Sequence, residues 1–293
     1  MGRTVFPSTF SIVAFDPGNG DLGVAVQSKF LAVGAAVPCA RAGVGAIATQ
    51  AYANLSYGPN GLEMLAAGAS AQEVLDRLTA ADEQRALRQV GIVDAQGRAA
   101  SYTGAECTHW AGHLAGDGWA CQGNILVGEE TVRAMASAFQ EAEGELAERL
   151  VAALAAGQRA GGDRRGQQSA ALLVVRSGGS YGGFTDRYLD LRVDDHPRPI
   201  EELARVLRLH RIYFQKARPE DLIPLEGALL EEVQTLLSRL GYYQGSIGAP
   251  YDEATRQALF NYAGVENLEE RLSEAARIDP VVLEFLRKSA ERP

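Results

Sequence analysis

The first fifty residues contain a strand pattern with a hydroxyl residue at its head. Residues 11–15 and 22–28 are apolar runs on either side of a turn at 16–20 that holds Pro, Asn and two Gly residues. Gly and Asn tolerate the backbone angles of a tight connection, so this pattern predicts two antiparallel strands. Thr9 comes at the start of the first strand. There it either serves as a nucleophile or, being β-branched, only begins the strand.

A Thr hydroxyl needs activation before it can attack a carbonyl. One route uses the free α-amine of the same residue, which titrates at roughly 7.7 to 8.0 and can therefore act as a base near neutral pH. Eight residues precede Thr9, and a peptide nitrogen cannot play this part. The nucleophile hypothesis therefore requires the removal of Met1 to Ser8.

The rest of the chain alternates between strand and helix patterns. Ser70 and Glu73 form the capping-box pattern at a predicted helix start. The order of strands, helices, strands, helices and strands predicts an α+β layered sandwich. Two prolines among acidic residues predict a linker at 218–224, which separates a domain at 1–217 from a small helical domain at 225–293. We expect strands at 37–49, 89–94, 99–103, 118–122, 169–175 and 187–193, and helices at 62–67, 70–79, 132–141, 145–156 and 200–214.

Composition excludes several classes of protein. The net charge is -9 and no run of Lys or Arg occurs, which argues against a nucleic-acid partner. The 3 cysteines form no CxxC pair, so we expect neither a disulfide framework nor a thiolate zinc site, and a reducing cytoplasm fits best. Neither an export signal nor a membrane span is recognisable.

Polar clusters lie at the ends of several predicted strands. One contains Gln122 and Asn124, and a loop at 162–169 contains Asp163 and Ser169. A third, at 49–54, could form a wall of a pocket. Loops on a rigid scaffold often carry function. The alternatives are a solvated surface loop at 162–169 and a helix cap at Asn124.

Other reactive residues offer weaker candidates. His109 and His113 are four residues apart, as in helical metal sites, but the neighbouring glycines favour a strand or loop, so we predict no metal. Cys39 is more consistent with a buried thiol than with a nucleophile. The turn at 194–196, Asp-Asp-His, has no partner residue that would suggest a triad.

Four segments together resemble a known family. They are TFSIVAFDPGNGDLGVAVQSKFLAVG, ARAGVGAIATQAYANLSYGPNGLEML, CQGNIL and GGDRRGQQSAALLVV. Over about residues 8–217 the chain resembles DUF1028, a bacterial and archaeal family of unknown function placed in the Ntn-hydrolase superfamily. The resemblance implies a four-layer αββα sandwich. Family members often begin Met-Thr, so that removal of Met would expose the Thr, whereas this chain carries an extension.

A looser resemblance to proteasome β-type subunits suggests roles for individual residues. Thr9 matches their nucleophile and Asp163 matches their Asp before the last core strand. Their acid on the second strand falls at Gln27, which departs from the pattern. Their lysine falls at Arg41, or is replaced in space by Lys29. Arginine stays charged but cannot shuttle a proton.

The resemblance implies an amidohydrolase that acts on a small or peptide-like amide without a cofactor. Thr9 would attack, Asp163 would orient it, and Lys29 and Arg41 would tune the amine or bind a substrate carboxylate. A homo-oligomer is expected by analogy. The alternative is a non-catalytic binding or assembly protein that keeps the fold. Substrate or oxyanion contacts are expected from Gln27, Gln50, Asn54, Gln122, Asn124 and Ser169, with backbone amides as further oxyanion donors.

Residues at about 228–262 resemble a peptidoglycan-binding helical repeat. The pattern of that repeat is a Leu-Gln pair, then Gly-Tyr-Tyr-x-Gly, and then a Thr before an Ala-Leu run, and this chain has the sequence LLEEVQTLLSRLGYYQGSIGAPYDEATRQALFNYAG there. The resemblance implies a glycan as partner. The alternative is a small helical module that caps or dimerises the main domain, with Tyr242, Tyr243 and Phe260 in its core.

Overall fold

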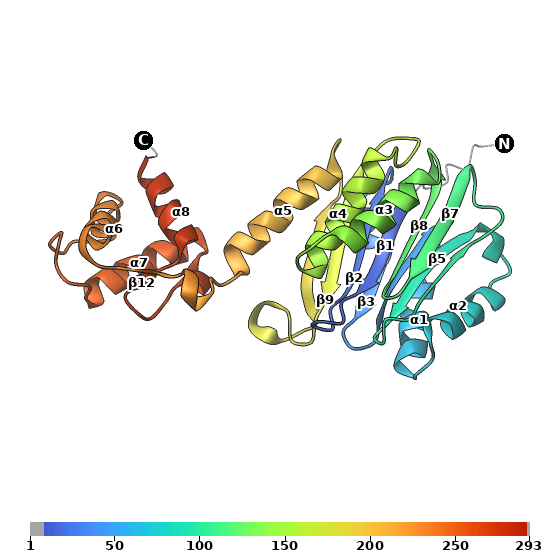
Figure 1. Cartoon of the computed structure of the whole chain (residues 1–293), viewed down its shortest axis with the longest axis horizontal. Coiled ribbons are helices and arrows are strands. Elements are labelled where there is room, and N and C mark those ends of the chain that lie inside the picture. The colour runs from blue at the N-terminus through green and yellow to red at the C-terminus, as the bar shows by residue number, and fades with distance from the viewer. Residues whose placement is uncertain (1–8, 292–293) are drawn as a thin grey trace. The chain divides into compact units, whose positions relative to one another are not determined.

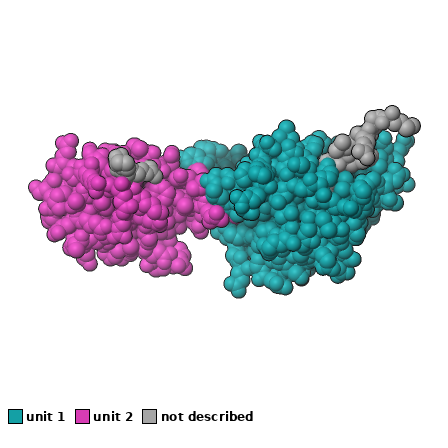
Figure 2. Space-filling model, turned by 90° about the horizontal axis from the view of Figure 1, so that it is seen from above, with its two compact units in different colours: residues 1–205 teal, residues 206–293 magenta. Residues whose placement is uncertain are grey.

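The computed structural model describes residues 9–291, and the chain divides into two compact units, Met1–Arg205 and Val206–Pro293. Figure 1 shows the elements of both, and Figure 2 shows their extents. The boundary falls within helix α5, Pro199–Phe214. The possible removal of Met1 to Ser8 concerns residues outside the described range. No helix within residues 9–291 is long and apolar enough to cross a membrane.

The first unit is built around a six-stranded antiparallel sheet with the strand order β10-β9-β2-β1-β8-β7. Its central strand β1 pairs with β2 through Thr9 and Ser28, and with β8 through Thr9 and Asn124. Apolar side chains on both faces of this central region are buried, among them Phe10 and Ile12 on one face and Val13 and Val24 on the other. The strands are β1 Thr9–Phe15, β2 Leu22–Ser28, β7 Trp110–Gly116, β8 Trp119–Leu126, β9 Ser169–Val175 and β10 Arg187–Val193.

A second sheet of four strands packs face to face on the first. The layer between them is filled by small side chains such as Val13, Val24, Ala46 and Ala48, which allow the backbones to approach closely. Its strands, in sheet order, are β3 Pro38–Arg41, β4 Gly45–Ala51, β5 Arg88–Asp94 and β6 Ala99–Thr103.

Each sheet carries a pair of helices on its outer face (Figure 1). Helices α3, Glu130–Glu141, and α4, Leu146–Arg159, cover the six-stranded sheet. Helices α1, Tyr57–Ala66, and α2, Ala71–Ala80, cover the four-stranded sheet. The close approach of α4 explains Gly23 on β2, because a Cβ there would lie 2.6 Å from Leu150.

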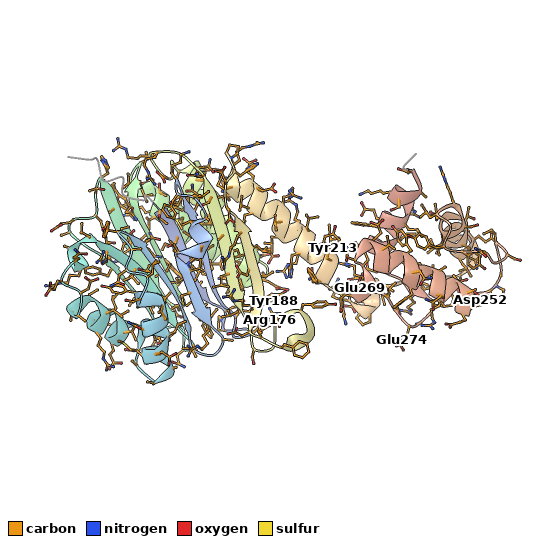
Figure 3. The ribbon with its side chains drawn as sticks, turned by 180° about the vertical axis from the view of Figure 1, so that it is seen from behind. Arg176, Tyr188, Tyr213, Asp252, Glu269 and Glu274 are labelled. Atoms are coloured by element: carbon orange, nitrogen blue, oxygen red, sulfur yellow. The ribbon has the colours of Figure 1, made fainter. Side chains whose placement is uncertain are left out.

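The strands β2 and β9 are fastened at the end far from Thr9. Arg176, just after β9, forms an ion pair with the buried carboxylate of Asp21 at 2.6 Å and stacks over the ring of Tyr188 at 4.0 Å (Figure 3). Asp21 is only 1% exposed, whereas the Arg176 side chain is 33% exposed, so the carboxylate is buried and the guanidinium partly solvated. The ion pair joins the start of β2, the strand that ends at Ser28, to the end of β9.

The second unit is mainly helical. Its core includes Val233, Leu237, Tyr243 and Tyr262. The alternative that placed Phe260 in a module core is wrong for that residue, since its side chain is 53% exposed, because it lies on the outer face of its helix. The elements are β11 Ile223–Pro224, α6 Gly227–Arg239, α7 Glu253–Glu266, β12 Arg277–Ile278 and α8 Pro280–Glu291.

Most predicted elements occur close to their expected places, and both the mixed α+β class and the helical C-terminal region are confirmed. Ser70 and Glu73 form the predicted capping box at the start of α2. The strand expected at 37–49 is two strands, because Gly43, at φ +70°, turns the chain back between them. The segment around His109 and His113 leads into and forms part of the edge strand β7 rather than a helix.

Candidate functional site

Thr9 lies at the head of the central strand β1, with its side chain directed between the two sheets. It shares this face with its register partners Ser28 and Asn124. The Oγ1 atom of Thr9 lies 3.1 Å from Oγ of Ser28, and the residue is only 2% exposed. The carbonyl oxygen of Thr9 accepts bonds from Nε2 of Gln50 at 3.3 Å and from Nδ2 of Asn124 at 3.4 Å. Three strands therefore hold this one residue.

A network of buried amides lies directly next to Thr9. Gln89 is its centre, because its Oε1 accepts from Nε2 of Gln50 at 2.8 Å and from Nδ2 of Asn124 at 2.9 Å. Ser11 donates to Oε1 of Gln50 at 2.5 Å and accepts from Nε2 of Gln122 at 2.6 Å. Since buried amides are costly unless bonded, this network fixes the positions of its members relative to one another. It joins both sheets beneath the candidate nucleophile.

Asp163 contacts the residue that follows Ser28 in the chain. Its Oδ2 accepts from the backbone amide of Lys29 at 2.9 Å, and its carboxylate pairs with Arg165 at 3.1 Å. Lys29 donates through Nζ to the carbonyl of Gln167 at 3.2 Å. Asp163 and Lys29 thus lie near the site, and the hydrogen bond from the Lys29 amide to Asp163 holds the chain that follows Ser28.

An apolar cavity of about 260 Å³ opens beside Thr9. Among the described residues, its polar side-chain groups are those of Thr9 and Gln50 and the hydroxyl of Tyr52, and the remaining lining side chains are apolar. Val33 and Val37 are buried at its floor, whereas Phe30 is 42% and Leu55 is 55% exposed at its rim. The arrangement places the Thr9 hydroxyl at the edge of an apolar pocket.

The backbone around this cavity is unusual. Ala32, Ala51 and Ile125 have φ of 52°, 65° and 52°, in the left-handed region that non-glycine residues avoid. Ala51 ends β4 and begins the loop that lines the cavity, and Ile125 follows Asn124. Backbone strain of this kind persists where the surrounding structure enforces it, and it clusters at functional sites.

A buried ion pair supports the loop after Ala51. Arg88 pairs with Asp82 at 2.9 Å, donates to the carbonyl of Tyr52 at 2.6 Å and lies 5.4 Å from the Tyr52 ring centre. The hydrogen bond from Arg88 holds the pKa of Asp82 well below its usual range. Desolvation, with the bond to Asp82, raises the pKa of Tyr57. Arg88, itself fixed by Asp82, therefore holds both the carbonyl and the ring of Tyr52 in place.

Two predicted residues lie away from Thr9. Arg41 forms an exposed ion pair with Glu63 at 2.6 Å. Its register partner on the neighbouring strand β4 is Gly45, the first residue of that strand. Gln50 lies five residues further along the same strand, so about 17 Å of strand separates that end from the cavity. Gln27 points to the opposite face of β2 from Ser28, together with Phe10 and toward α4, and neither of its amide atoms has a hydrogen-bond partner in residues 9–291.

Asn54 and Ser169 have positioning contacts. The amide of Asn54 donates to Asp82 at 3.1 Å and its oxygen accepts from Ser56. Oγ of Ser169 accepts from the amide of Val33 at 3.0 Å and donates to the carbonyl of Phe30 at 2.5 Å. Ser169 therefore shapes the turn that forms one cavity wall.

The structure also places the other reactive side chains. Nδ1 of His113 lies 2.9 Å from Oγ1 of Thr103, and desolvation lowers the pKa of this imidazole. Burial raises the thiol pKa of Cys39, Cys107 and Cys121, so none is an activated nucleophile. No cluster of three or more potential ligands for a metal ion occurs within residues 9–291.

Sequence reasoning missed three residues that this site depends on: Ser28, Gln89 and Arg88. Each contacts its functional partner across a strand pair or between sheets, so a linear pattern does not reveal the contact. Gly91, two residues after Gln89, is the nearby sequence feature that reflects the network. A Cβ at Gly91 would lie 2.1 Å from Oε1 of Gln122, so this glycine makes room for the amide network.

Comparisons with known proteins match the two compact units of the chain to two different families. A family model described as "Family of unknown function (DUF1028)" matches residues 9–203, and one described as "Putative peptidoglycan binding domain" matches residues 213–286. A crystal structure of a DUF1028 protein from Silicibacter pomeroyi is similar, with a TM-score of 0.64 and 29% sequence identity. The match covers 77% of this chain and 89% of that chain. No curated protein matches the sequence.

Proposed function

The chain belongs to DUF1028, a family of unknown function, and we propose that it is an N-terminal-nucleophile amidohydrolase whose nucleophile is Thr9. The observation that carries the proposal is the position of the Thr9 hydroxyl. It lies at the head of a central strand, 3.1 Å from Ser28, at the edge of an apolar cavity. Two sheets packed face to face, each with an outer helical pair, support assignment to the αββα sandwich of Ntn hydrolases.

The proposed reaction begins with the self-catalysed hydrolysis of the Ser8–Thr9 bond. One water is consumed, the released segment ends in the Ser8 carboxylate, and Thr9 keeps the free amine. The amine takes the proton of Oγ1 as Oγ1 bonds to the substrate carbonyl carbon. The same proton then passes to the leaving nitrogen, and the C–N bond breaks. Water attacks the resulting ester and gives the acid and the free hydroxyl. No cofactor is needed for these steps.

The oxyanion donors in this proposal are backbone amides. The Nδ2 of Asn124 already donates to Gln89 and to the Thr9 carbonyl, and the amide of Asn54 is bonded to Asp82. Both side chains therefore serve better as positioning groups. Asp163 and Ser28 orient the hydroxyl and the adjacent chain. Lys29 remains the candidate cation, whereas the exposed pair with Glu63 gives Arg41 no part in the proposed reaction.

Intact mass and N-terminal sequencing of the purified protein test the first step. After a day at neutral pH, we expect a species that begins at Thr9, and none from the Thr9→Ala variant. A variant that encodes Met directly before Thr9 tests the chemistry separately, because removal of Met exposes the amine. If that variant, with a confirmed Thr9 terminus, releases no amine from a panel of acyl amides, the amidohydrolase assignment fails.

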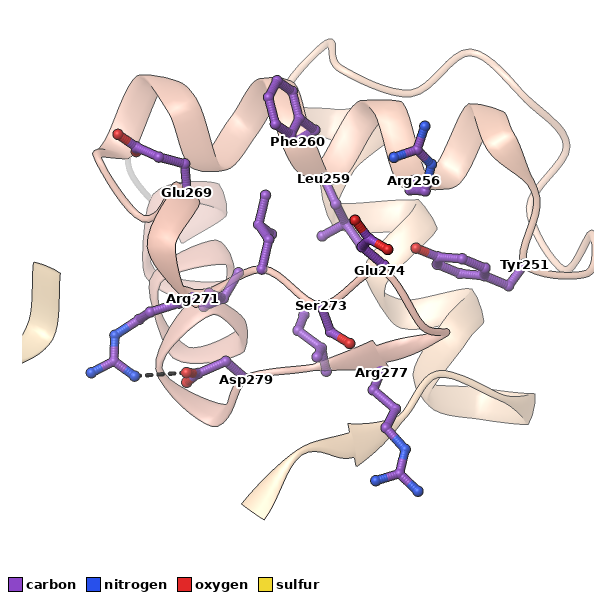
Figure 4. A pocket seen from close by; sticks show the side chains of 13 residues that line it. Tyr251, Arg256, Leu259, Phe260, Glu269, Arg271, Ser273, Glu274, Arg277 and Asp279 are labelled. Atoms are coloured by element: carbon purple, nitrogen blue, oxygen red, sulfur yellow. Dashed lines mark hydrogen bonds and ion pairs between the residues drawn. The ribbon is translucent and has the colours of Figure 1, made fainter. Parts of the chain in front are cut away.

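A binding role is the second candidate, favoured by the match of residues 213–286 to a peptidoglycan-binding model. A cavity of about 170 Å³ in this unit has Tyr251, Phe260, Arg256 and Glu274 among its lining residues (Figure 4). Aromatic rings beside charged groups suit a glycan that carries peptide substituents. Arg271 and Asp279, a buried ion pair at 2.6 Å, also line it.

Co-sedimentation of the full chain with purified peptidoglycan tests this role. We expect binding to fall when Tyr251 and Phe260 are both changed to Ala. Tyr181→Ala is the matched control, because Tyr181 is 71% exposed in the first unit. No binding by the unmodified chain would reject a wall-binding role. A homo-oligomeric state stays a prediction that light scattering can measure.

A further inference from the structure

We infer that the substrate of the proposed hydrolase carries an uncharged apolar group on the acyl side of its amide, and that the cavity beside Thr9 binds this group. The inference rests on the proposed function. It goes further by naming the chemical class of the substrate, which neither the family nor the reaction type supplies.

The lining of the cavity carries the inference. No charged side chain of the described residues lines it, and Thr9 and Gln50 are its only residues with polar side chains apart from the hydroxyl of Tyr52. The Gln50 amide is occupied by Ser11 and Gln89. A charged acyl group would lose its hydration without gaining a partner, which is costly. An apolar group would gain by burial.

The size of the cavity limits the group. Its volume of about 260 Å³ is below the roughly 300 to 1,000 Å³ typical of sites for drug-sized ligands. We therefore expect a single aliphatic or aromatic side chain, or a short fatty acyl chain. Phe30, Tyr52 and Leu55 extend the apolar surface at the mouth, with exposures of 42%, 45% and 55%.

The cavity walls are held in place before any substrate binds. Ser169 bonds to both ends of the turn from Phe30 to Val33. On the other wall, Oγ1 of Thr49 donates to the carbonyl of Asn54 at 3.2 Å, and Arg88 holds the carbonyl of Tyr52. A preformed apolar pocket next to the nucleophile selects its substrate with little ordering cost.

A series of 7-amido-4-methylcoumarin substrates tests the inference with one constant leaving group. The protein is the chain with a confirmed Thr9 terminus, and the acyl groups are acetyl, hexanoyl, phenylpropionyl and glutaryl. We expect kcat/KM for hexanoyl or phenylpropionyl to exceed that for glutaryl by at least 10-fold. One methylene group more or less on a substrate that binds in a hydrophobic pocket typically changes kcat/KM by about 10- to 200-fold.

Substitution at the rim connects the preference to this cavity. Phe30→Glu should lower the ratio of kcat/KM for the hexanoyl amide to kcat/KM for the acetyl amide at least 10-fold. Phe30 is partly exposed, so the variant is expected to fold. Phe184→Glu is the matched control, because Phe184 is 91% exposed outside the cavity lining.

Binding without catalysis separates the two proposals. A Thr9→Ala variant that begins at position 9 should bind the hexanoyl amide more tightly than the glutaryl amide. This preference, with no hydrolysis by the Thr9 protein, would support the pocket assignment and reject the hydrolase. Hydrolysis without an apolar preference, or with a preference for glutaryl, would overturn the pocket assignment alone. No binding and no hydrolysis would overturn both.

Discussion

The hydroxyl oxygens of Thr9 and Ser28 lie 3.1 Å apart on neighbouring antiparallel strands, and either can donate to the other. Ser28 is fully buried, and the amide of the next residue, Lys29, is fixed by Asp163. The contact therefore restricts where Oγ1 of Thr9 can point. In the proposed enzyme this makes Ser28 a positioning residue, which acts on the substrate through Thr9.

Loss of the Ser28 hydroxyl should slow the reaction more than it weakens binding. For Ser28→Ala we expect kcat to fall by about 100-fold, the effect of misplacing a reacting group by about 1 Å, with little change in KM. Steady-state kinetics of the Thr9-terminal protein measure this. Ser28→Thr, which keeps a hydroxyl, should recover part of kcat. A Ser28→Ala enzyme with unchanged kcat would show that the contact has no positioning role.

The amide network should contribute to stability through Gln89. Gln89→Leu removes an acceptor from both Gln50 and Asn124, and a buried donor without a partner costs about 1–3 kcal/mol. We expect the free energy of unfolding of the first unit to fall by about 2 kcal/mol or more, measured by urea denaturation. The control is Gln72→Leu, at an exposed position of α2. Equal effects of the two substitutions would contradict a special role for the network.

The local features of the fold could be read from the sequence because nearby residues determine them. The turn after Phe15 and the capping box of Ser70 follow from the chemistry of a few neighbouring residues. The register that opposes Thr9 to Ser28, and so turns Gln27 to the helix-covered face, depends on the exact geometry of that turn. A register shift of one residue would place Gln27 instead of Ser28 opposite Thr9.

Contacts between the sheets could not be predicted in the same way. Gln89 and Asn124 meet because β5 packs on β8 of the other sheet, which is a property of the whole sandwich. Arg41 is close to Gln50 in the sequence, yet the extended strand β4 separates the end that pairs with Arg41 from the cavity. The sequence identified Thr9 and Asp163 as candidates, while their partners depend on long-range packing.

The strained end of β4 leads to a prediction with a matched control. Ala51 has φ of 65°, which costs a non-glycine residue about 1–2 kcal/mol, so Ala51→Gly removes this penalty. Ala48 lies on the same strand, is also buried and has no positive φ, so Ala48→Gly should destabilise by about 0.5–1 kcal/mol. We expect Ala51→Gly to be the more stable variant by at least 1 kcal/mol in urea denaturation. The reverse order would show that Ala51 is not strained.

The ion pair of Asp82 and Arg88 should make the stability of the first unit sensitive to acid. The hydrogen bond from Arg88 lowers the pKa of Asp82 below its ordinary value of 3.8. The unfolded chain therefore binds the proton more readily, so the stabilisation is complete above about pH 5 and is lost as the pH falls through the lower folded value. Asp82→Asn should remove about 2 kcal/mol at pH 7, since hydrogen bonds to charged groups contribute about 1.5–3 kcal/mol.

The measurement is the free energy of unfolding between pH 7 and pH 3. The difference between the unmodified protein and Asp82→Asn should shrink over the acid part of this range. Asp76→Asn, at an exposed position of α2, is the control and should follow the unmodified protein at every pH. If Asp82→Asn lost as much stability at pH 3 as at pH 7, the ionised carboxylate would not be the source of the effect. Its loss would then reflect the hydrogen bonds of Tyr57 and Asn54 to Asp82, which do not require the charge.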